Sequence, residues 1–271
     1  MLRPILLTGS LEASAATFAS LLSAQSSATG QLVVAGHGPE RMLIERLARA
    51  FEKASPGAAV TISWDRTLKA IEMVKSGKAH VAVTGEEDPD LTATTIAWDG
   101  IAVVVNFPNP VKEVTTQQLR DLFSSNLRLW SDLDERAAGK VELIRRPDDR
   151  NITASFEQSL GITGKMRDTA ESIRSDQKVL SRVSGRLGAV GYLSLEAALE
   201  AVKFGTPIRI LLVDGVEPAE PTVKNGRYKL RRPVLLLTSK KADPLTAAFV
   251  EFTLLPRGQT IVDEIFIPYS P

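Results

Sequence analysis

The chain has 271 residues, of which 44% are apolar, so it is long enough for one large domain or two lobes with a real core. Lysine and arginine number 33 against 32 acidic residues, and this balance excludes an overall field that would attract nucleic acid. The absence of cysteine excludes disulfides and thiolate metal sites. With only two histidines, His37 and His80, we expect no histidine-based metal centre. We also expect no cofactor.

Residues 1–30 have features of an export signal. Met1 and Arg3 provide a short basic start, a run of small and apolar residues follows, and Ser26, Ser27 and Ala28 suit a cleavage site. Because Glu12 interrupts the apolar run, a disordered leader is the alternative. No later apolar run is long enough for a membrane span, and we expect a soluble mature protein.

The first part of the chain alternates strand and helix patterns. Strands are predicted over 31–35, 58–64 and 79–83, and helices over 39–51 and 67–76. This βαβαβ order predicts a parallel sheet with right-handed crossovers, in which the ligand lies beyond the carboxyl ends of the strands. The candidate ligand-binding positions at those ends are Gly38, Pro39, Arg66, Thr84 and Glu86.

Two of these positions have a more specific interpretation. The glycine turn before Pro39 would aim the N–H groups of a helix start at a ligand, although such turns are ordinary in α/β proteins. Glu86 could accept a proton from a protonated ligand, and the alternative is a solvated loop acid beside Glu87 and Asp88.

The later part of the chain predicts segments that cross between lobes. The β-rich run 96–107 is broken at Asp99 and Gly100, as suits a hinge. The small-residue strand 188–192 suits a second crossing or a close approach of backbones. Further helices are predicted at 115–123, where Thr115 and Gln118 form a capping box, and over 176–184, 194–204 and 243–255, with strands over 208–213 and 232–238.

Residues 143–156 form the most informative segment. A short apolar strand ends in a charged turn, and a helix begins near Arg150 with Phe156 on its inner face. The unpaired N–H groups and positive dipole end of a helix start favour an anion, and Arg146 and Arg150 add guanidinium groups suited to oxyanions. The alternative is a solvated turn in which both arginines pair with Asp148 and Asp149.

Four segments together resemble one family. They are Ile96–Asn106 followed by Asn109-Pro110, Gly188–Tyr192, Gly226–Pro233 and Gly258–Val262. In this order they resemble the phosphate-binding proteins of ABC importers, which have the type II periplasmic binding-protein fold. The resemblance extends from about Leu32 to the C-terminus. It implies an α/β protein with two lobes, each a mostly parallel sheet flanked by helices.

The resemblance also implies a division of the chain and roles for particular residues. One lobe would comprise 31–98 plus 193–271 and the other 99–192, with a hinge at Asp99, Gly100, Gly191 and Tyr192. The phosphate loop of the family reads Arg-x-x-x-Ser-Gly-Thr-x-x-x-Phe. Arg146 and Phe156 match it, whereas Arg150, Asn151 and Ile152 stand where Ser, Gly and Thr are expected. Glu86 lies near an acidic residue of the family that accepts the ligand's proton.

These departures define two competing functions. Each hydrogen bond lost to a charged, buried oxyanion would cost roughly 1.5–3 kcal/mol, although Arg150 could compensate for a larger or more highly charged anion. The resemblance implies a monomeric, periplasmic solute-binding protein that delivers phosphate or a related oxyanion to the membrane subunits of an ABC importer. The alternative is an interaction or sensory module that no longer captures phosphate. We expect no catalytic residues, because neither a Ser-His-Asp pattern nor a glycine-rich phosphate loop with lysine is present.

Overall fold

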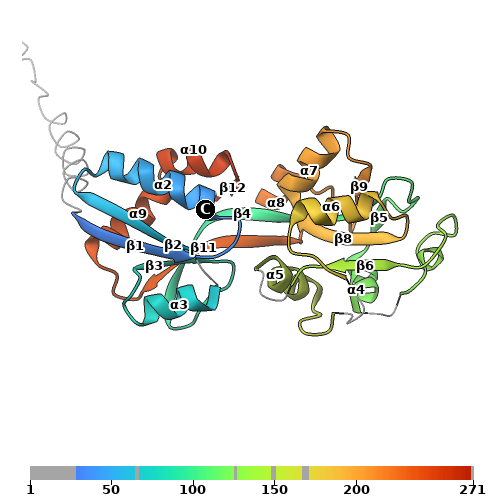
Figure 1. The fold of residues 1–271 in the computed structure, drawn as a ribbon, viewed down its shortest axis with the longest axis horizontal. Helices are drawn as coiled ribbons and strands as arrows, with labels where there is room; N and C mark the ends of the chain where they lie inside the picture. The colour runs from blue at the N-terminus through green and yellow to red at the C-terminus, as the bar shows by residue number, and fades with distance from the viewer. Residues whose placement is uncertain (1–28, 65–66, 125–126, 148–150, 167–170, 270–271) are drawn as a thin grey trace, which may run out of the picture.

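The computed structural model describes residues 29–64, 67–124, 127–147, 151–166 and 171–269. Within these residues the chain forms two α/β lobes joined by two long strands, as Figure 1 shows. Residues 1–28 of the predicted leader, Arg66 and Arg150 lie outside the described residues, and Gly30, the last residue of that leader, already belongs to the first strand. No helix in the described ranges combines the length and the apolar character needed to cross a membrane.

A ten-stranded mixed sheet runs through both lobes. Its order is β2-β1-β3-β11-β4-β8-β6-β7, with β12 and β9 also paired to β4. The strands of this sheet are β1 (Gly30–Gly36), β2 (Ala58–Trp64), β3 (Val81–Thr84), β4 (Leu91–Asn106), β6 (Glu142–Arg145), β7 (Glu171–Ser172), β8 (Ala189–Ser194), β9 (Ile208–Ile210), β11 (Arg231–Ser239) and β12 (Ile267–Pro268). A separate pair is formed by β5 (Glu113–Val114) and β10 (Leu212–Val213).

The first lobe confirms the predicted parallel βαβαβ unit. β1 pairs in parallel with both β2 and β3. The helices α2 (Arg41–Ala54), α9 (Pro244–Leu254) and α10 (Pro256–Asp263) pack on one face, and α3 (Thr67–Lys75) packs on the other. Alternate residues of β1 pack into the cores on the two faces of the sheet. Leu32 and Val34 lie in the core with α2, and Ala35 lies in the core with α3.

The second lobe has a single large core. It contains α4 (Thr116–Ser124), the 3₁₀ helix η2 (Trp130–Asp132), α5 (Asn151–Leu160), α6 (Asp176–Ser184), α7 (Leu195–Lys203) and α8 (Glu220–Lys224). The predicted capping box of α4 is confirmed. The Thr115 N–H donates to Oε1 of Gln118 at 2.7 Å, and the Gln118 N–H donates to Oγ1 of Thr115 at 3.1 Å.

The strands β4 and β11, which we call the crossing strands, connect the lobes. Figure 1 shows both strands running from one lobe to the other, and in their register Arg231 pairs with Gly100 and Arg232 pairs with Asp99. β4 continues without a break through Asp99 and Gly100 and then pairs with β8 in the second lobe. The predicted segment 96–107 therefore does cross between the lobes.

Two features of the predicted division differ from the structure. Residues 195–230, which we assigned to the first lobe, pack in the second core through side chains such as Ala198, Leu211 and Tyr228. Gly191 and Tyr192, predicted at the hinge, lie inside the second-lobe sheet, where β8 pairs with β4 and β6. A Cβ on Gly191 would lie 3.1 Å from Cγ1 of Val179, so the small residue permits a close approach, and β11 supplies the second crossing instead.

Candidate functional site

A cleft of about 440 Å³ lies between the lobes, and we call it the interlobe cleft. Its lining residues come from the first lobe, the second lobe and the crossing strands. They are His37, Gly38, Pro39 and Trp64, then Arg146, Ile152, Arg174, Ser175, Asp176 and Ser194, and finally Asp99 and Arg232. The structure thus brings together four of the predicted ligand-binding residues, Gly38, Pro39, Arg146 and Ile152, although they are separated by more than a hundred positions in the chain.

The first-lobe wall is built by the turn after β1. Gly38 has a φ of +100°, which an L side chain rarely adopts, and its carbonyl accepts a 3.1 Å hydrogen bond from Nε1 of Trp64. The indole ring covers Gly36, where a Cβ would come within 2.5 Å of the ring. Helix α2 begins at Arg41 rather than at Pro39, so Pro39 belongs to the turn. This wall offers an indole and a pyrrolidine ring to the cleft, next to His37.

A buried carboxylate lies behind this wall, at the start of α2. Glu40 is the N-cap of the helix, and its backbone carbonyl accepts from the Ile44 N–H at 3.0 Å. Its side chain is fully buried, and Oε2 has no hydrogen-bond partner among the described residues. A negative charge at this position offsets the positive end of the α2 dipole, so less positive potential remains for a ligand. The α2 start is therefore a poorer anion site than the glycine turn alone predicts.

The crossing strands hold the counter-charge of Glu40. Arg232 is 1% exposed and donates to Oε1 of Glu40. Its Nε and Nη2 lie 3.0 and 2.8 Å from Oδ2 of Asp99. Ser194, at the end of β8, donates to Oδ1 of Asp99 at 3.1 Å. We call Glu40, Arg232 and Asp99 the buried ion network, and two of its members, Arg232 and Asp99, line the floor of the cleft.

Burial dominates the electrostatics of this network. Desolvation raises the pKa of Asp99 above its usual range, although the charge and hydrogen bonds of Arg232 act in the opposite direction. Burial alone would lower the pKa of Arg232, but the attraction of Glu40 and Asp99 outweighs it and raises that pKa further. Arg232 therefore stays charged at any ordinary pH, so it is a fixed cation at the hinge.

The second-lobe wall is centred on Arg146, which follows β6. The residue is 7% exposed, and its Nη1 lies 2.5 Å from Oδ1 of Asp176. Its Nη2 donates to the backbone carbonyl of Arg174. Its Nε has no hydrogen-bond partner in the described part of the chain. The guanidinium is thus held in place, its charge is partly compensated by Asp176, and Nε is a donor without an acceptor among the described residues.

An aromatic stack fixes the backbone around Arg146. The Arg146 N–H donates to the hydroxyl of Tyr192 at 3.1 Å, and the same hydroxyl lies 3.1 Å from Oγ1 of Thr153 on α5. The Tyr192 ring stacks on Phe156 with centroids 4.0 Å apart. Desolvation raises the pKa of Tyr192, so its hydroxyl remains protonated. Phe156 is buried, and the prediction of its inward position is confirmed.

The start of α6 also lines the cleft, and the sequence analysis did not select it. Ser175 is the N-cap, and its Oγ accepts from the Lys178 N–H at 3.3 Å. The free N–H groups and the dipole of this helix start favour an anion, whereas Asp176 in the first turn opposes one. The sequence signal was present, because Ser175 followed by an acidic residue is a typical N-cap pattern.

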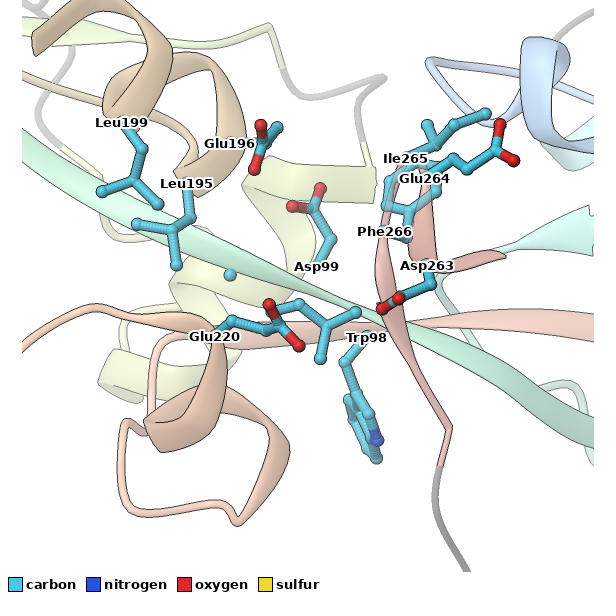
Figure 2. A pocket seen from close by; sticks show the side chains of 12 residues that line it. Trp98, Asp99, Leu195, Glu196, Leu199, Glu220, Asp263, Glu264, Ile265 and Phe266 are labelled. Atoms are coloured by element: carbon cyan, nitrogen blue, oxygen red, sulfur yellow. The ribbon is translucent and has the colours of Figure 1, made fainter. Parts of the chain in front are cut away.

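A second pocket, of about 100 Å³, lies against the crossing strands and the C-terminal segment (Figure 2). Five acidic residues line it: Asp99, which also lines the interlobe cleft, Glu196, Glu220, Asp263 and Glu264. Because these carboxylates repel an anion, this pocket does not suit an oxyanion. The interlobe cleft is the better candidate site.

Comparison with known proteins identifies the family. A family model described as the PBP superfamily domain matches residues 23–257. The chain belongs to this superfamily. The phosphate-binding protein PstS of Bacillus subtilis is 23% identical over 261 residues, covering 90% of this chain and 82% of that protein. Phosphate-binding protein PstS 2 of Streptococcus pneumoniae is 36% identical over 110 residues, covering 39% of this chain and 38% of that protein.

Solved structures confirm the fold of this PBP superfamily member. An ABC-type phosphate transport receptor from Vibrio cholerae matches with a TM-score of 0.77 and 22% identity, over 89% of this chain and 100% of that chain. A phosphate ABC transporter substrate-binding protein with bound phosphate from Clostridium perfringens matches with a TM-score of 0.73 and 22% identity, over 89% of this chain and 100% of that chain. The predicted two-lobed α/β fold is confirmed by these similarities.

Two predicted positions lie outside the interlobe cleft of this PBP superfamily member. Thr84 is fully buried, and its Oγ1 accepts from the Glu86 N–H at 3.2 Å, while Glu86 itself is exposed. Neither residue lines the cleft. Thr84 pairs with Leu235, three positions along β11 from Arg232, so β3 ends roughly 10 Å short of the cleft floor at about 3.3 Å per residue. Asn151 begins α5, next to the cleft-lining Ile152.

Proposed function

We propose that the protein is a non-enzymatic solute-binding protein that captures phosphate or a related oxyanion in the interlobe cleft. It would act as a periplasmic monomer and deliver its ligand to the membrane subunits of an ABC importer. The observation that carries the proposal is the position of Arg146, a nearly buried guanidinium on the wall of a cleft between two lobes. The printed names of the relatives, phosphate-binding protein and phosphate transport receptor, agree with it.

The charges of the cleft support capture of an anion without a large excess of positive charge. Three arginines and two aspartates line it, and Glu40 lies behind the first-lobe wall. Nearly balanced fixed charges favour recognition through directed hydrogen bonds, which are strong when the acceptor is an oxyanion. The N–H groups at the α6 start and the guanidinium of Arg146 are such donors.

Calorimetry at low ionic strength tests this function. Purified protein is titrated with phosphate, sulfate, arsenate and methylphosphonate, and we expect heat with at least one of them. Arg146→Gln should weaken that binding by roughly ten- to a hundredfold, because hydrogen bonds to a charged group contribute about 1.5–3 kcal/mol each. The exposed Arg227→Gln is the matched control and should leave binding unchanged. Thermal unfolding without ligand shows whether either variant is folded.

A binding-deficient interaction or sensory module is the second candidate function. The observation that favours it is the pairing of Arg146 with Asp176, which already occupies part of the guanidinium. A thermal-shift panel of anions separates the two functions, because a ligand that binds the folded state raises its stability by mass action. If no anion gives either a shift or heat, the solute-binding function is wrong and this candidate takes its place.

A further inference from the structure

The two walls of the interlobe cleft differ in their chemistry. The second-lobe wall carries the cationic side chains of Arg146 and Arg174 and the start of α6. The first-lobe wall carries the rings of Pro39 and Trp64 next to His37 and Gly38, with the carboxylate of Glu40 behind the wall. A charged group is therefore favoured on one side of the cleft, and the rings of Pro39 and Trp64 give the other side an apolar surface.

Trp64 and Pro39, on the described part of the first-lobe wall, lack a donor that is available to an oxyanion. Nε1 of Trp64 is already bonded to the carbonyl of Gly38, and Pro39 has no N–H. On the second lobe, Ile152 adds an apolar side chain beside the charged wall. If the lobes closed on inorganic phosphate, the oxygens that face Trp64 and Pro39 would lose water without gaining donors. Such unsatisfied oxygens are costly, because an unpaired charged group loses its full solvation.

The size of the cleft points in the same direction. Its volume of about 440 Å³ lies within the range of roughly 300–1,000 Å³ that sites for organic ligands occupy, whereas phosphate has only a handful of atoms. An organic group attached to the oxyanion would fill the remaining space. It would also replace the unsatisfied oxygen with a carbon surface that the indole and proline rings can cover.

We propose that the interlobe cleft selects tetrahedral phosphorus oxyanions that carry an apolar organic group over inorganic phosphate. The inference rests on the proposed function. The oxyanion head binds between Arg146 and the start of α6, where Nε of Arg146 has no acceptor in the described ranges. The organic group lies against Trp64, Pro39 and Ile152. Phosphonates and phosphate monoesters share this chemistry.

Competitive calorimetry with a matched series tests the inference. The ligands are inorganic phosphate, methylphosphonate, phenylphosphonate and phenyl phosphate, so size and the type of phosphorus bond vary separately. We expect the phenyl compounds to bind at least about tenfold more tightly than phosphate, as burial of an aromatic ring predicts. If only phenylphosphonate is preferred over phosphate, the ligand class is the phosphonates. If only phenyl phosphate is preferred, the ligand class is the phosphate monoesters.

Two variants locate the selectivity. Ile152→Thr restores a hydroxyl on the cleft wall and should shift the ratio of phenylphosphonate to phosphate affinity about tenfold toward phosphate. Trp64→Phe keeps an apolar ring and should retain the preference for phenyl compounds. Ile265→Thr is the matched control, because Ile265 is a half-buried isoleucine that lines the second pocket (Figure 2) and should leave the ratio unchanged.

The possible outcomes separate this inference from the proposed function. If no oxyanion in the series binds, the proposed function fails and the inference fails with it. If phosphate binds as tightly as phenylphosphonate, or more tightly, the inference is wrong while the solute-binding function stands. If phenylphosphonate is preferred but Ile152→Thr leaves the ratio unchanged, the assignment of the apolar wall is overturned.

Discussion

Replacing Arg232 with methionine would leave Glu40 and Asp99 buried without their shared counter-charge. Arg232 is 1% exposed, Glu40 is fully buried and Asp99 is 4% exposed, so none of the three can recover its solvation from bulk water. Breaking a buried ion network by removing one partner costs about 3–5 kcal/mol, because uncompensated charge remains in the interior. A domain's total stability is typically about 5–15 kcal/mol, so the loss is a large fraction of the whole.

The cost should also depend on pH. Burial already raises the pKa of Asp99, and the loss of the Arg232 charge would raise it further. A carboxyl whose folded-state pKa is raised contributes stability that is complete below its unfolded pKa and is lost as pH rises through its folded pKa. The variant should therefore lose less stability at about pH 4.5 than at about pH 7.5, because protonated carboxyls need no counter-charge.

Urea denaturation of the wild type and Arg232→Met at the two pH values measures both effects. We expect the free energy of unfolding of the variant to fall by about 3–5 kcal/mol at neutral pH. Arg227→Met, at an exposed position, is the control and should change stability by less than about 0.5 kcal/mol. Adding Glu40→Gln and Asp99→Asn to Arg232→Met should recover part of the loss. A loss below about 1 kcal/mol, or an equal loss at both pH values, would refute the reasoning.

Three further changes test other parts of the structure. Asp176→Asn removes the carboxylate that pairs with Arg146, and calorimetry should show oxyanion binding about tenfold tighter, whereas weaker binding would show that the pair positions the guanidinium. Tyr192→Phe leaves the Arg146 N–H without its acceptor and should cost about 1–3 kcal/mol in urea denaturation, with a negligible cost contradicting the burial argument. Asp243→Ala removes the N-cap of α9, where Oδ1 accepts from the Thr246 N–H at 3.0 Å, and should cost about 1 kcal/mol. Burial would raise the pKa of Asp243, but the hydrogen bonds from Thr246 outweigh it and lower that pKa, so the cost should be present above about pH 4 and disappear as pH falls further.

The sequence predicted the local elements of the first lobe well, because their signals are local. Apolar runs of four to seven residues alternate with helical periodicity, and β2 begins and ends at the predicted residues, Ala58 and Trp64. The N-cap at Asp243 and the capping box at Thr115 were also readable, since a cap involves neighbours within one helical turn.

Pairing between strands that are distant in the chain could not be predicted from local sequence patterns. The small residues of 188–192 are compatible with a crossing segment or with a close approach of backbones, and one sequence does not distinguish them. The structure selects the close approach, with Gly191 against Val179 and Ile144. The true second crossing, at Arg231 and Arg232, reads as the polar end of an ordinary apolar strand.

The candidate site was predicted in part for the same reason. Arg146 and Gly38 follow strand ends, beyond which the rule expects a ligand, and both line the interlobe cleft. Glu86 also follows a strand end but does not line the cleft, because the rule does not say how far each strand reaches. The partners of Arg232 lie 133 and 192 positions away in the chain, so the buried ion network depends on tertiary contacts that no local pattern reports.

The buried ion network couples the floor of the cleft to the movement of the lobes. Glu40 belongs to the first lobe, Asp99 and Arg232 to the crossing strands, and Ser194 to the edge of the second lobe. A hinge motion that separated these groups would expose or unpair a buried charge, which is costly. The lobes should therefore rotate about this network rather than through it, with bending confined to backbone on either side. Trp64 and Arg146 lie on opposite sides of that pivot, so closure would bring the apolar and the cationic wall together on one ligand.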